Sequence, residues 1–294
     1  MQHRVFGTTG LTVSALGFGA GQIGVAAMDE ATAGHLLNLA ADLGVTLFDT
    51  ARGYGTSEER IGRHLAHRRD TLVLSTKVGY GIEGHEDWTY GCVAAGIDAA
   101  LRRLATDRID IVHLHSCPLE TLERGEVIEA LTDAMRAGKV RATGYSGDNA
   151  ALDHAVDDGR FLAVEHSLNI CDQRVIDGAL ARAHRRDLGV IAKRPVANAP
   201  WQFTERPTGD YAEEYWWRWR AMAIDPRGLD WQELALRFTA FTPGVHSCLV
   251  GTRHPDHLRK NVELVARGPL PDDHVAAIRA AFQANDPGWW RGET

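Results

Sequence analysis

Cysteine, positive charge and long apolar runs are all scarce in this chain of 294 residues. The four cysteines are far apart and form no Cys-x-x-Cys pair, so the sequence predicts free thiols and a cytoplasmic location. A formal net charge of −7 argues against the basic face that nucleic-acid binding needs. No stretch of about 18 apolar residues is present, and the first residues lack the basic and apolar parts of a signal peptide. We therefore expect no nucleic-acid partner and no membrane-spanning helix.

The chain does contain a regular alternation of short apolar runs and amphipathic segments. The runs have the length of buried β-strands, and the segments between them space their apolar residues as helices do. Within residues 31–43, for example, Leu36, Leu39 and Leu43 lie on one helical stripe, and Ser57 is expected to cap the next helix. The predicted strands span residues 15–18, 45–48, 72–75, 109–114, 140–144, 161–164, 190–192 and 248–250. The predicted helices span residues 31–43, 57–67, 89–104, 123–137, 149–158, 173–187, 231–240 and 255–264.

This order of elements predicts one α/β domain over residues 1–294, folded as a (β/α)8 TIM barrel. Residues 4–14, with glycines at turn positions, are expected to form a β-hairpin before the first strand. An open, doubly wound sheet is the competing architecture, but it needs a Gly-x-Gly-x-x-Gly turn. Gly17, Gly19 and Gly21 do not have that spacing, so the barrel is favoured.

A long connection, residues 198–222, follows the seventh predicted strand and is rich in aromatic side chains. Long loops at the C-terminal face of a barrel commonly hold substrate, so Trp201 and Phe203 are candidate substrate contacts. The part from Tyr215 to Trp219 can instead be an extra helix that packs its rings on the barrel wall. We expect both arrangements within this one connection.

Four polar residues lie at or just beyond the ends of consecutive predicted strands: Asp49, Tyr54, Lys77 and His115. In a barrel these ends surround one mouth, which is the active face. A carbonyl that accepts hydride needs a proton at its oxygen, and a tyrosine can supply it when a nearby ammonium stabilises the phenolate. Asp49 can keep Lys77 charged, and a neutral imidazole can orient the carbonyl. The set therefore predicts reduction of a carbonyl by hydride, with Tyr54 as the proton donor.

Other interpretations of the same residues are open. Each of the four could singly be a capping, solvated or surface side chain, and their joint occurrence is what favours catalysis. His113, His115 and Cys117 alternate along one strand and could bind zinc, as in a metal-dependent hydrolase. Pro118 is expected to bend the chain before Cys117 can point inward, so we predict no metal site.

Together these motifs resemble the aldo-keto reductase family over nearly the whole chain. The resemblance lies in Phe-Gly-Thr-Thr-Gly-Leu near the N-terminus, Leu-Phe-Asp-Thr-Ala around Asp49, Tyr-Gly at Tyr54, Thr-Lys-Val around Lys77, Ile-Asp-Ile-Val-His-Leu-His up to His115, and Val-Gly-Thr-Arg-His-Pro after residue 249. It implies a (β/α)8 barrel that binds an extended nicotinamide dinucleotide across its C-terminal face and acts on a small-molecule carbonyl. It also implies that Tyr54 is the proton donor, tuned by its lysine and aspartate neighbours.

The resemblance further implies that residues after the fifth and sixth strands hold the nicotinamide carboxamide. Ser146 fits that role, whereas Gly147 stands where the family usually has an asparagine. Glu165 replaces a usual glutamine, and Leu168 replaces a tyrosine that stacks under the nicotinamide. Glu165 can still accept a hydrogen bond from the carboxamide, but Leu168 offers no ring face, which is worth about 1 kcal/mol. We expect cofactor binding to survive these changes but to weaken.

The resemblance also implies how the phosphates and the adenine are held. Lys193 and Arg194 follow the seventh strand, where they could neutralise the pyrophosphate or form a solvated pair. The helix after the last strand begins beside Arg253, and a helix N-terminus with an arginine suits the 2′-phosphate of NADP(H). NADP(H) is therefore favoured over NAD(H). The residues expected to contact this part of the cofactor are Gly251, Thr252, Arg253, His257 and Asn261.

The sequence thus predicts NADPH-dependent reduction of an aldehyde or ketone to an alcohol. One alternative is an NAD(P)-dependent sugar or alcohol dehydrogenase on the same barrel, because these residues do not set the direction of the reaction. Another is a non-catalytic NADP-binding barrel that senses redox state, which the changes at Glu165 and Leu168 favour.

Overall fold

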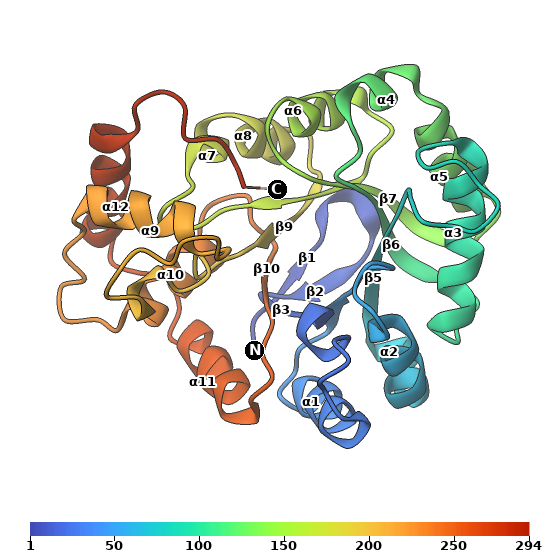
Figure 1. Ribbon diagram of the computed structural model, residues 1–294, viewed down its shortest axis with the longest axis horizontal. Coiled ribbons are helices and arrows are strands. Elements are labelled where there is room, and N and C mark those ends of the chain that lie inside the picture. Colours follow the sequence, from blue (N-terminus) through green and yellow to red (C-terminus); the bar gives the residue numbers. More distant parts are fainter. Residues whose placement is uncertain (294) are drawn as a thin grey trace.

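Eight parallel strands close into a barrel in the computed structural model, which describes residues 1–293 (Figure 1). Around the barrel the strands follow chain order, and the last strand, β10, pairs with the first, β3. This arrangement confirms the predicted α/β class and the (β/α)8 barrel. The strands are β3 (Leu16–Gly19), β4 (Leu47–Asp49), β5 (Val73–Val78), β6 (Ile109–His115), β7 (Val140–Ser146), β8 (Ala163–Ser167), β9 (Gly189–Lys193) and β10 (Ser247–Val250).

Helices surround the barrel, and most lie where the apolar spacing predicts them (Figure 1). The predicted segments 123–137 and 173–187 are each divided, at Gly125 and at Gly178. The helices are α1 (Glu30–Asp42), α2 (Ser57–Leu65), α3 (Tyr90–Arg103), α4 (Leu119–Arg124), α5 (Glu126–Arg136), α6 (Asn149–Asp158), α7 (Arg174–Asp177), α8 (Ala179–Arg185), α9 (Glu213–Met222), α10 (Trp231–Ala240), α11 (Pro255–Ala266) and α12 (Asp272–Asn285). Short 3-10 turns are η1 (Gly7–Thr9), η2 (Ala20–Ile23), η3 (Ala66–Thr71) and η4 (Pro200–Gln202).

Ser57 does not cap α2 as expected, because it is the first residue of the helix and Thr56 precedes it. Its hydroxyl instead donates to the Ala20 carbonyl at 2.9 Å and accepts from the Thr50 hydroxyl at 2.7 Å. These buried bonds tie the loop between β4 and α2 to η2. The same loop carries Tyr54, so the serine fixes the position of a predicted catalytic residue.

The predicted N-terminal hairpin is present as β1 (His3–Val5) and β2 (Thr12–Ser14), which pair antiparallel. The side chains of Phe6, Leu11 and Val13 are buried together with the first residues of two barrel strands, Leu47 and Val73. The hairpin therefore closes the N-terminal end of the barrel. Access to the barrel is left to the opposite end, where the strands finish.

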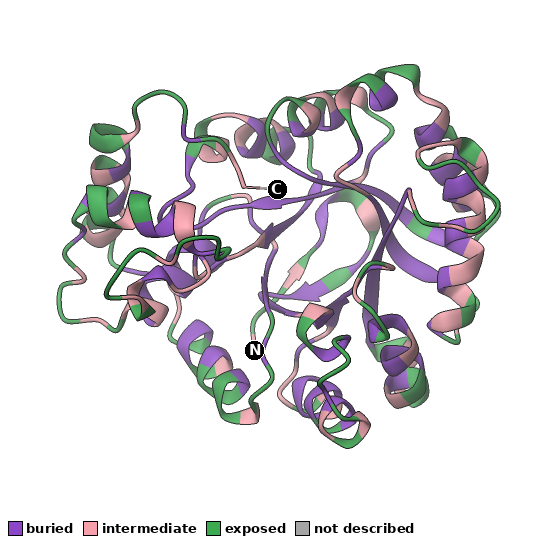
Figure 2. Cartoon of the chain, in the orientation of Figure 1, coloured by how far each residue is buried: buried purple, intermediate pink, exposed green. Residues whose placement is uncertain are grey.

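The barrel strands are mostly buried, while the helices are buried toward the barrel and exposed outward (Figure 2). Charged groups are buried as well, at the C-terminal ends of the strands: Asp49, Lys77 and Glu165 are each at most 2% exposed. Burying a charge is costly unless it is paired, so this concentration marks a site. All four cysteines are buried and free. Among residues 1–293, no helix combines the length and the apolar character needed to cross a membrane.

The long connection after β9 contains the extra helix that the sequence allows, α9. Tyr215 and Trp216 are buried on it, whereas Trp217 is 48% exposed. Tyr215 belongs to a second apolar cluster with residues of α10 and α12, including Leu234 and Phe282. These three helices lie together at one side of the barrel (Figure 1). The helix α12, which the sequence analysis does not predict, is thus needed to cover α9.

Candidate active site

The Lys77 ammonium lies at the centre of the polar cluster in the barrel mouth. It donates to Oδ2 of Asp49 at 2.5 Å and to the Thr50 carbonyl at 3.0 Å. The Ser75 hydroxyl donates to the other Asp49 oxygen at 2.8 Å and fixes that carboxylate. Burial acts to lower the pKa of Lys77, but the Asp49 and Glu165 carboxylates outweigh it and raise that pKa above its ordinary value. The predicted lysine–aspartate pair is therefore formed, with the Lys77 ammonium charged.

Tyr54, in the loop between β4 and α2, lies against this ammonium. Nζ of Lys77 is 5.2 Å from the centroid of the phenol ring. The His115 ring meets the phenol edge-on, with 5.9 Å between ring centroids. Gly21 approaches the ring from η2, where an added Cβ would lie 3.7 Å from it. The structure thus brings all four predicted catalytic residues, including Asp49, to one mouth.

The acidity of the Tyr54 phenol differs from the expectation. Lys77 acts to lower the pKa of Tyr54, as the sequence leads us to expect, but burial and the Asp49 and Glu165 carboxylates outweigh the ammonium. The net pKa is raised. Burial is the largest cause of the rise, and Lys77 also faces two carboxylates rather than the single one that the strand ends suggest.

His115 is held by a residue that the sequence analysis does not predict, Tyr80. The Tyr80 hydroxyl lies 2.8 Å from Nδ1 of His115, and the two rings are stacked with 5.6 Å between centroids. Trp88 packs against Tyr80 at 5.8 Å. Burial, and then the Lys77 ammonium, lower the pKa of His115 to about 3, so its imidazole is neutral near pH 7. The signal for Tyr80 in the sequence is its place three residues after Lys77, at the same strand end.

Glu165 brings a second carboxylate to Lys77 from β8, across the barrel mouth. Its Oε1 lies 3.4 Å from Nζ of Lys77 and accepts from the Ser146 hydroxyl at 3.2 Å. Its Oε2 is buried without a hydrogen-bond partner among the described residues, and Nε2 of His113 is 3.9 Å away. Ser146 and Glu165, the residues expected to hold a carboxamide, are therefore direct neighbours.

The two carboxylates share one ammonium, so they titrate as a coupled pair. Burial, and then the Glu165 charge, raise the pKa of Asp49 to about 7. Burial acts to raise the pKa of Glu165, but Lys77 and then His113 outweigh it and lower that pKa to about 2. Burial lowers the pKa of His113 itself to about 4, which leaves it neutral. The pair therefore takes up its first proton at a higher pH than an isolated carboxylate does.

The zinc site considered from the sequence is not formed. His115 pairs with Tyr80, and Cys117 lies in the apolar core, so neither joins His113 in a set of ligand atoms. Asp49, His113 and Glu165 do place ligand atoms within 4.8 Å of one another. The Lys77 ammonium, however, already contacts both of these carboxylates and supplies the positive charge there.

A groove of about 880 Å³ runs from this cluster across the barrel mouth. One end is lined by Asp49, Tyr54, His115 and Glu165, and the other end reaches the start of α11. The predicted residues along the rest of its wall are Lys193, Arg194, Trp201, Gly251, Thr252, His257 and Asn261. The groove has the volume and the mixed polar and apolar lining that are typical of a cofactor or ligand site.

Two residues expected at the carboxamide lie just behind this wall. Ser146 is buried and reaches the groove through Glu165. Gly147 donates its backbone N–H to the Glu165 carbonyl at 3.0 Å. A Cβ at Gly147 would lie 2.4 Å from the Tyr145 hydroxyl, which explains why the usual asparagine is absent here. Tyr145 thus occupies the space that a larger side chain would require.

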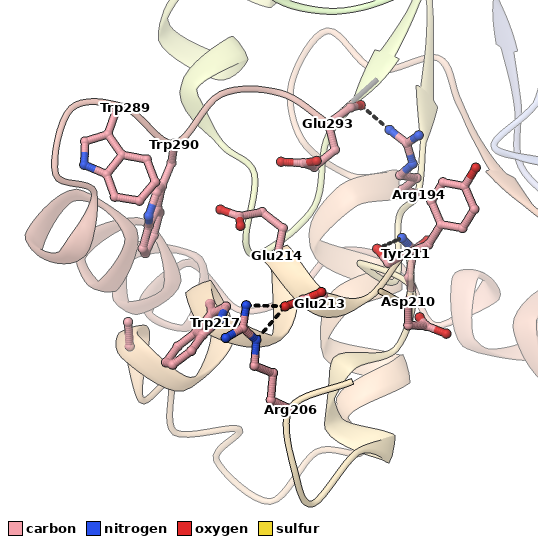
Figure 3. Close-up of a pocket in the computed structure, with 12 residues that line it drawn as sticks. Arg194, Arg206, Asp210, Tyr211, Glu213, Glu214, Trp217, Trp289, Trp290 and Glu293 are labelled. Carbon is pink, nitrogen blue, oxygen red and sulfur yellow. Dashed lines mark hydrogen bonds and ion pairs between the residues drawn. The ribbon is translucent and has the colours of Figure 1, made fainter. Parts of the chain in front are cut away.

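The expected pyrophosphate residues already have partners. Nζ of Lys193 lies 3.0 Å from an Asp148 carboxylate oxygen. Arg194 donates to the Ser167 hydroxyl at 2.7 Å and to the Glu293 backbone carbonyl (Figure 3). The Arg194 bonds come from one nitrogen of the guanidinium, Nη1, so the other two can still serve a ligand.

Arg194 also separates the groove from a second cavity of about 650 Å³. Arg194 and Tyr211 stand on one side of this cavity, and Trp289 and Trp290 on the other (Figure 3). The backbone that follows Arg194 in the chain is strained. Ala197, Asn198 and Ala199 have φ values of 50°, 56° and 53°, in the left-handed region.

At the far end of the groove, Asn261 accepts a 2.5 Å hydrogen bond from Gln232, a groove residue that the sequence analysis does not predict. The Thr252 hydroxyl accepts from the His254 backbone N–H at 3.1 Å, just before α11 begins. Arg253 is exposed and, unlike Gly251 and Thr252, is not among the residues that line the groove; it makes no hydrogen bond or ion pair within residues 1–293. Its guanidinium is therefore free for a ligand.

The two candidate substrate residues are placed differently. Trp201 lines the groove and stacks on Trp231 with 6.0 Å between ring centroids. Phe203 is not part of the groove wall, and its carbonyl accepts from the Trp216 indole at 3.0 Å. Of this pair, the structure thus brings Trp201 alone to the candidate site.

A barrel with this groove and this polar cluster defines a class, the nicotinamide-dependent barrel oxidoreductases. A model of the Aldo/keto reductase family matches residues 15–283, and the chain belongs to that family. It is an NAD(P)H-dependent oxidoreductase, and carbonyl reduction is the general reaction that this membership supports.

Similar proteins include both named and uncharacterised oxidoreductases. The chain is 26% identical to the uncharacterized oxidoreductase YqkF of Bacillus subtilis, over 95% of this chain and 96% of that protein. It is 30% identical to L-galactose dehydrogenase of Arabidopsis thaliana, over 90% of this chain and 88% of that protein. Among solved structures, the holo form of aldo-keto reductase AKR11C1 from Bacillus halodurans is 26% identical, with 96% of each chain covered and a TM-score of 0.84.

Proposed function

We propose that the protein reduces an aldehyde or ketone to an alcohol with NADPH, and that Tyr54 donates the proton. The observation that carries this proposal is the position of the phenol. It contacts both the Lys77 ammonium and the His115 imidazole and lines the groove of about 880 Å³ in the barrel mouth. A developing alkoxide at this point would be close to an O–H donor and a neutral imidazole.

The residues present fit a nicotinamide dinucleotide. The buried Oε2 of Glu165 has no partner and can accept from a carboxamide NH2. Lys193 and the free nitrogens of Arg194 can reach a pyrophosphate along the middle of the groove. Thr252 and Asn261 line the end where an adenosine would lie. When bound, the reduced dinucleotide would supply the hydride.

The preference for NADPH rests on Arg253. Its guanidinium has no partner in the described chain and lies just before the N-terminus of α11. Arginine grips a phosphate through two parallel hydrogen bonds, and the first N–H groups of a helix favour an anion. A cofactor with a 2′-phosphate would therefore gain contacts that NADH cannot make.

The chain's own groups can then be assigned roles in proton transfer. Tyr54 donates its hydroxyl proton to the reduced carbonyl oxygen, and Lys77 stabilises the phenolate that remains. With Tyr80 donating to Nδ1, the proton of His115 is on Nε2, which can donate to the carbonyl and fix its direction. Asp49 keeps the ammonium charged and in place.

Replacing Tyr54 with phenylalanine tests the assignment. We expect steady-state turnover with a panel of aldehydes and ketones to fall by at least about 100-fold, the usual range for a lost general acid. NADPH affinity, measured by quenching of protein fluorescence, should change little. Tyr90→Phe is the matched control, because Tyr90 is an exposed phenol on α3. Turnover in Tyr54→Phe equal to that of the control would contradict the assignment.

A dehydrogenase working in the reverse direction is the second candidate. The raised pKa of Tyr54 keeps the phenol protonated at neutral pH, which suits a proton donor better than a base. Two relatives are named as dehydrogenases, L-galactose dehydrogenase and pyridoxal 4-dehydrogenase. Their names are the reason to measure the oxidative direction as well. Initial rates in both directions, measured from pH about 6 to about 10, separate the two.

A further inference from the structure

Glu165 is distinctive because it reaches an ammonium that already has a partner. Asp49 comes from β4, the strand next to β5, and lies 2.5 Å from Nζ of Lys77. Glu165 comes from β8, three strands further round the barrel, and lies 3.4 Å from the same nitrogen. One buried cation therefore faces two buried carboxylates.

Within residues 1–293, Lys77 is the one charged cation that lies within 4 Å of the Glu165 carboxylate. His113 and His115, both from β6, are neutral near pH 7 because burial lowers the pKa of each. Lys193, from β9, is paired with Asp148 at 3.0 Å. With both carboxylates ionised, the cluster around Lys77 carries one excess negative charge.

The Tyr54 phenol lies next to this excess negative charge. The groups that face its phenol are Lys77 from β5, Asp49 from β4, Glu165 from β8, the neutral His115 from β6, and Tyr80 in the loop after β5. Lys77 favours the phenolate, whereas each carboxylate disfavours it. A second carboxylate on the same ammonium therefore offsets part of the help that Lys77 gives.

We propose that Glu165 is a positioning residue that acts through Lys77: its carboxylate shares the ammonium with Asp49 and holds the Tyr54 phenol in its protonated form. The inference rests on the proposed function of Tyr54. It deepens that function, because a phenol kept protonated is a proton donor over a wide pH range and a base only in alkaline solution. The residue thus biases the site toward carbonyl reduction at neutral pH.

The competing explanation is that Glu165 only supports the groove wall, by accepting from Ser146 and from a bound carboxamide. Glu165→Gln separates the two. Glutamine has the same shape and still accepts through its amide oxygen, but it lacks the charge. A supporting role changes cofactor affinity, whereas an electrostatic role changes the ionisation of Tyr54.

The test is a spectrophotometric titration of tyrosinate in the absence of cofactor. Subtracting the titration of Tyr54→Phe from that of the wild type isolates the Tyr54 phenol, and the same subtraction is made in the Glu165→Gln background. We expect the Tyr54 midpoint to fall by about one pH unit when Glu165 is neutralised, since one neighbouring charge shifts a pKa by that order. Glu129→Gln, an exposed carboxylate on α5, is the matched control and should cause no shift.

A midpoint that stays in place in Glu165→Gln, with the fold intact by circular dichroism, overturns the proposal. If that variant does not fold, Glu165→Met removes the charge with a side chain of similar length and is titrated in its place. The alkaline limb of the pH–rate profile for alcohol oxidation should move by the same amount. The wild type could show no turnover at all while Glu165→Gln still shifts the midpoint of the Tyr54 titration. That result would reject the proposed reaction but leave the inference about Glu165 standing.

Discussion

Replacing Lys77 with methionine should reveal the cost of burying the two carboxylates that it neutralises. Methionine keeps the length of the side chain but removes the ammonium that lies 2.5 Å from Asp49 and 3.4 Å from Glu165. All three side chains are at most 3% exposed, so water cannot take its place. Removing one partner of a buried ion pair costs about 3–5 kcal/mol. We expect a loss of unfolding free energy in that range at neutral pH.

The loss should also depend on pH in a defined direction. Without the ammonium, burial and mutual repulsion raise the folded-state pKa values of Asp49 and Glu165 above those of the unfolded chain. Such groups leave the fold undisturbed below the unfolded pKa, about 4, and destabilise it progressively as the pH rises from there to the folded-state value, above which the loss is constant. The difference between variant and wild type should therefore be smallest in acid and should grow toward alkaline pH.

Urea unfolding at about pH 5 and about pH 8 measures both effects. Lys139→Met is the matched control, because Lys139 pairs with Asp98 at 2.6 Å while both side chains are more than 40% exposed. An exposed pair of this kind contributes roughly 0–1 kcal/mol. If Lys77→Met loses no more stability than Lys139→Met at either pH, the buried ammonium does not hold this cluster together.

Three further predictions follow from single contacts. Tyr80→Phe should lower kcat/KM for a carbonyl by about tenfold while leaving the NADPH affinity unchanged, because it removes the hydrogen bond that sets the His115 tautomer. An unchanged kcat/KM would count against that role of Tyr80. Arg253→Ala should weaken NADPH binding by at least about tenfold and NADH binding little, with Arg259→Ala, an exposed arginine on the helix that follows Arg253, as control; equal losses for both dinucleotides would remove the argument for NADPH. Phe6→Ala should cost about 3–5 kcal/mol of unfolding free energy, because its ring is fully buried at the closed end of the barrel, with kcat of the folded fraction unchanged.

The barrel and the four polar residues of its mouth could be predicted because each depends on local sequence. The apolar runs fix the strands, and parallel strands of a barrel bring their ends to one face. Asp49, Lys77 and His115 stand at such ends, so their meeting follows from the order of the strands. Tyr54 follows from its short distance in the chain to Asp49.

The remaining features depend on contacts between distant segments, which no local pattern encodes. Glu165 reaches Lys77 from three strands away and adds, after burial and Asp49, to the causes that raise the Tyr54 pKa. Arg194 is held by the backbone carbonyl of Glu293, 99 residues further along the chain. At Gly147 a side chain would meet the Tyr145 hydroxyl. The resemblance to the family shows that the usual asparagine is missing there, but it does not show this cause.

Single-turnover reduction shows whether the protein reduces a carbonyl with NADPH and whether Tyr54 donates the proton. Protein pre-bound to NADPH is mixed with a reactive aldehyde such as nitrobenzaldehyde, and the loss of the reduced-nicotinamide absorbance is followed together with formation of the alcohol. We expect one equivalent of alcohol for each NADPH consumed in the wild type, and we expect Tyr54→Phe to bind NADPH normally but to consume it far more slowly. An identical rate in the two proteins, or a wild type that binds NADPH without consuming it, would contradict the account.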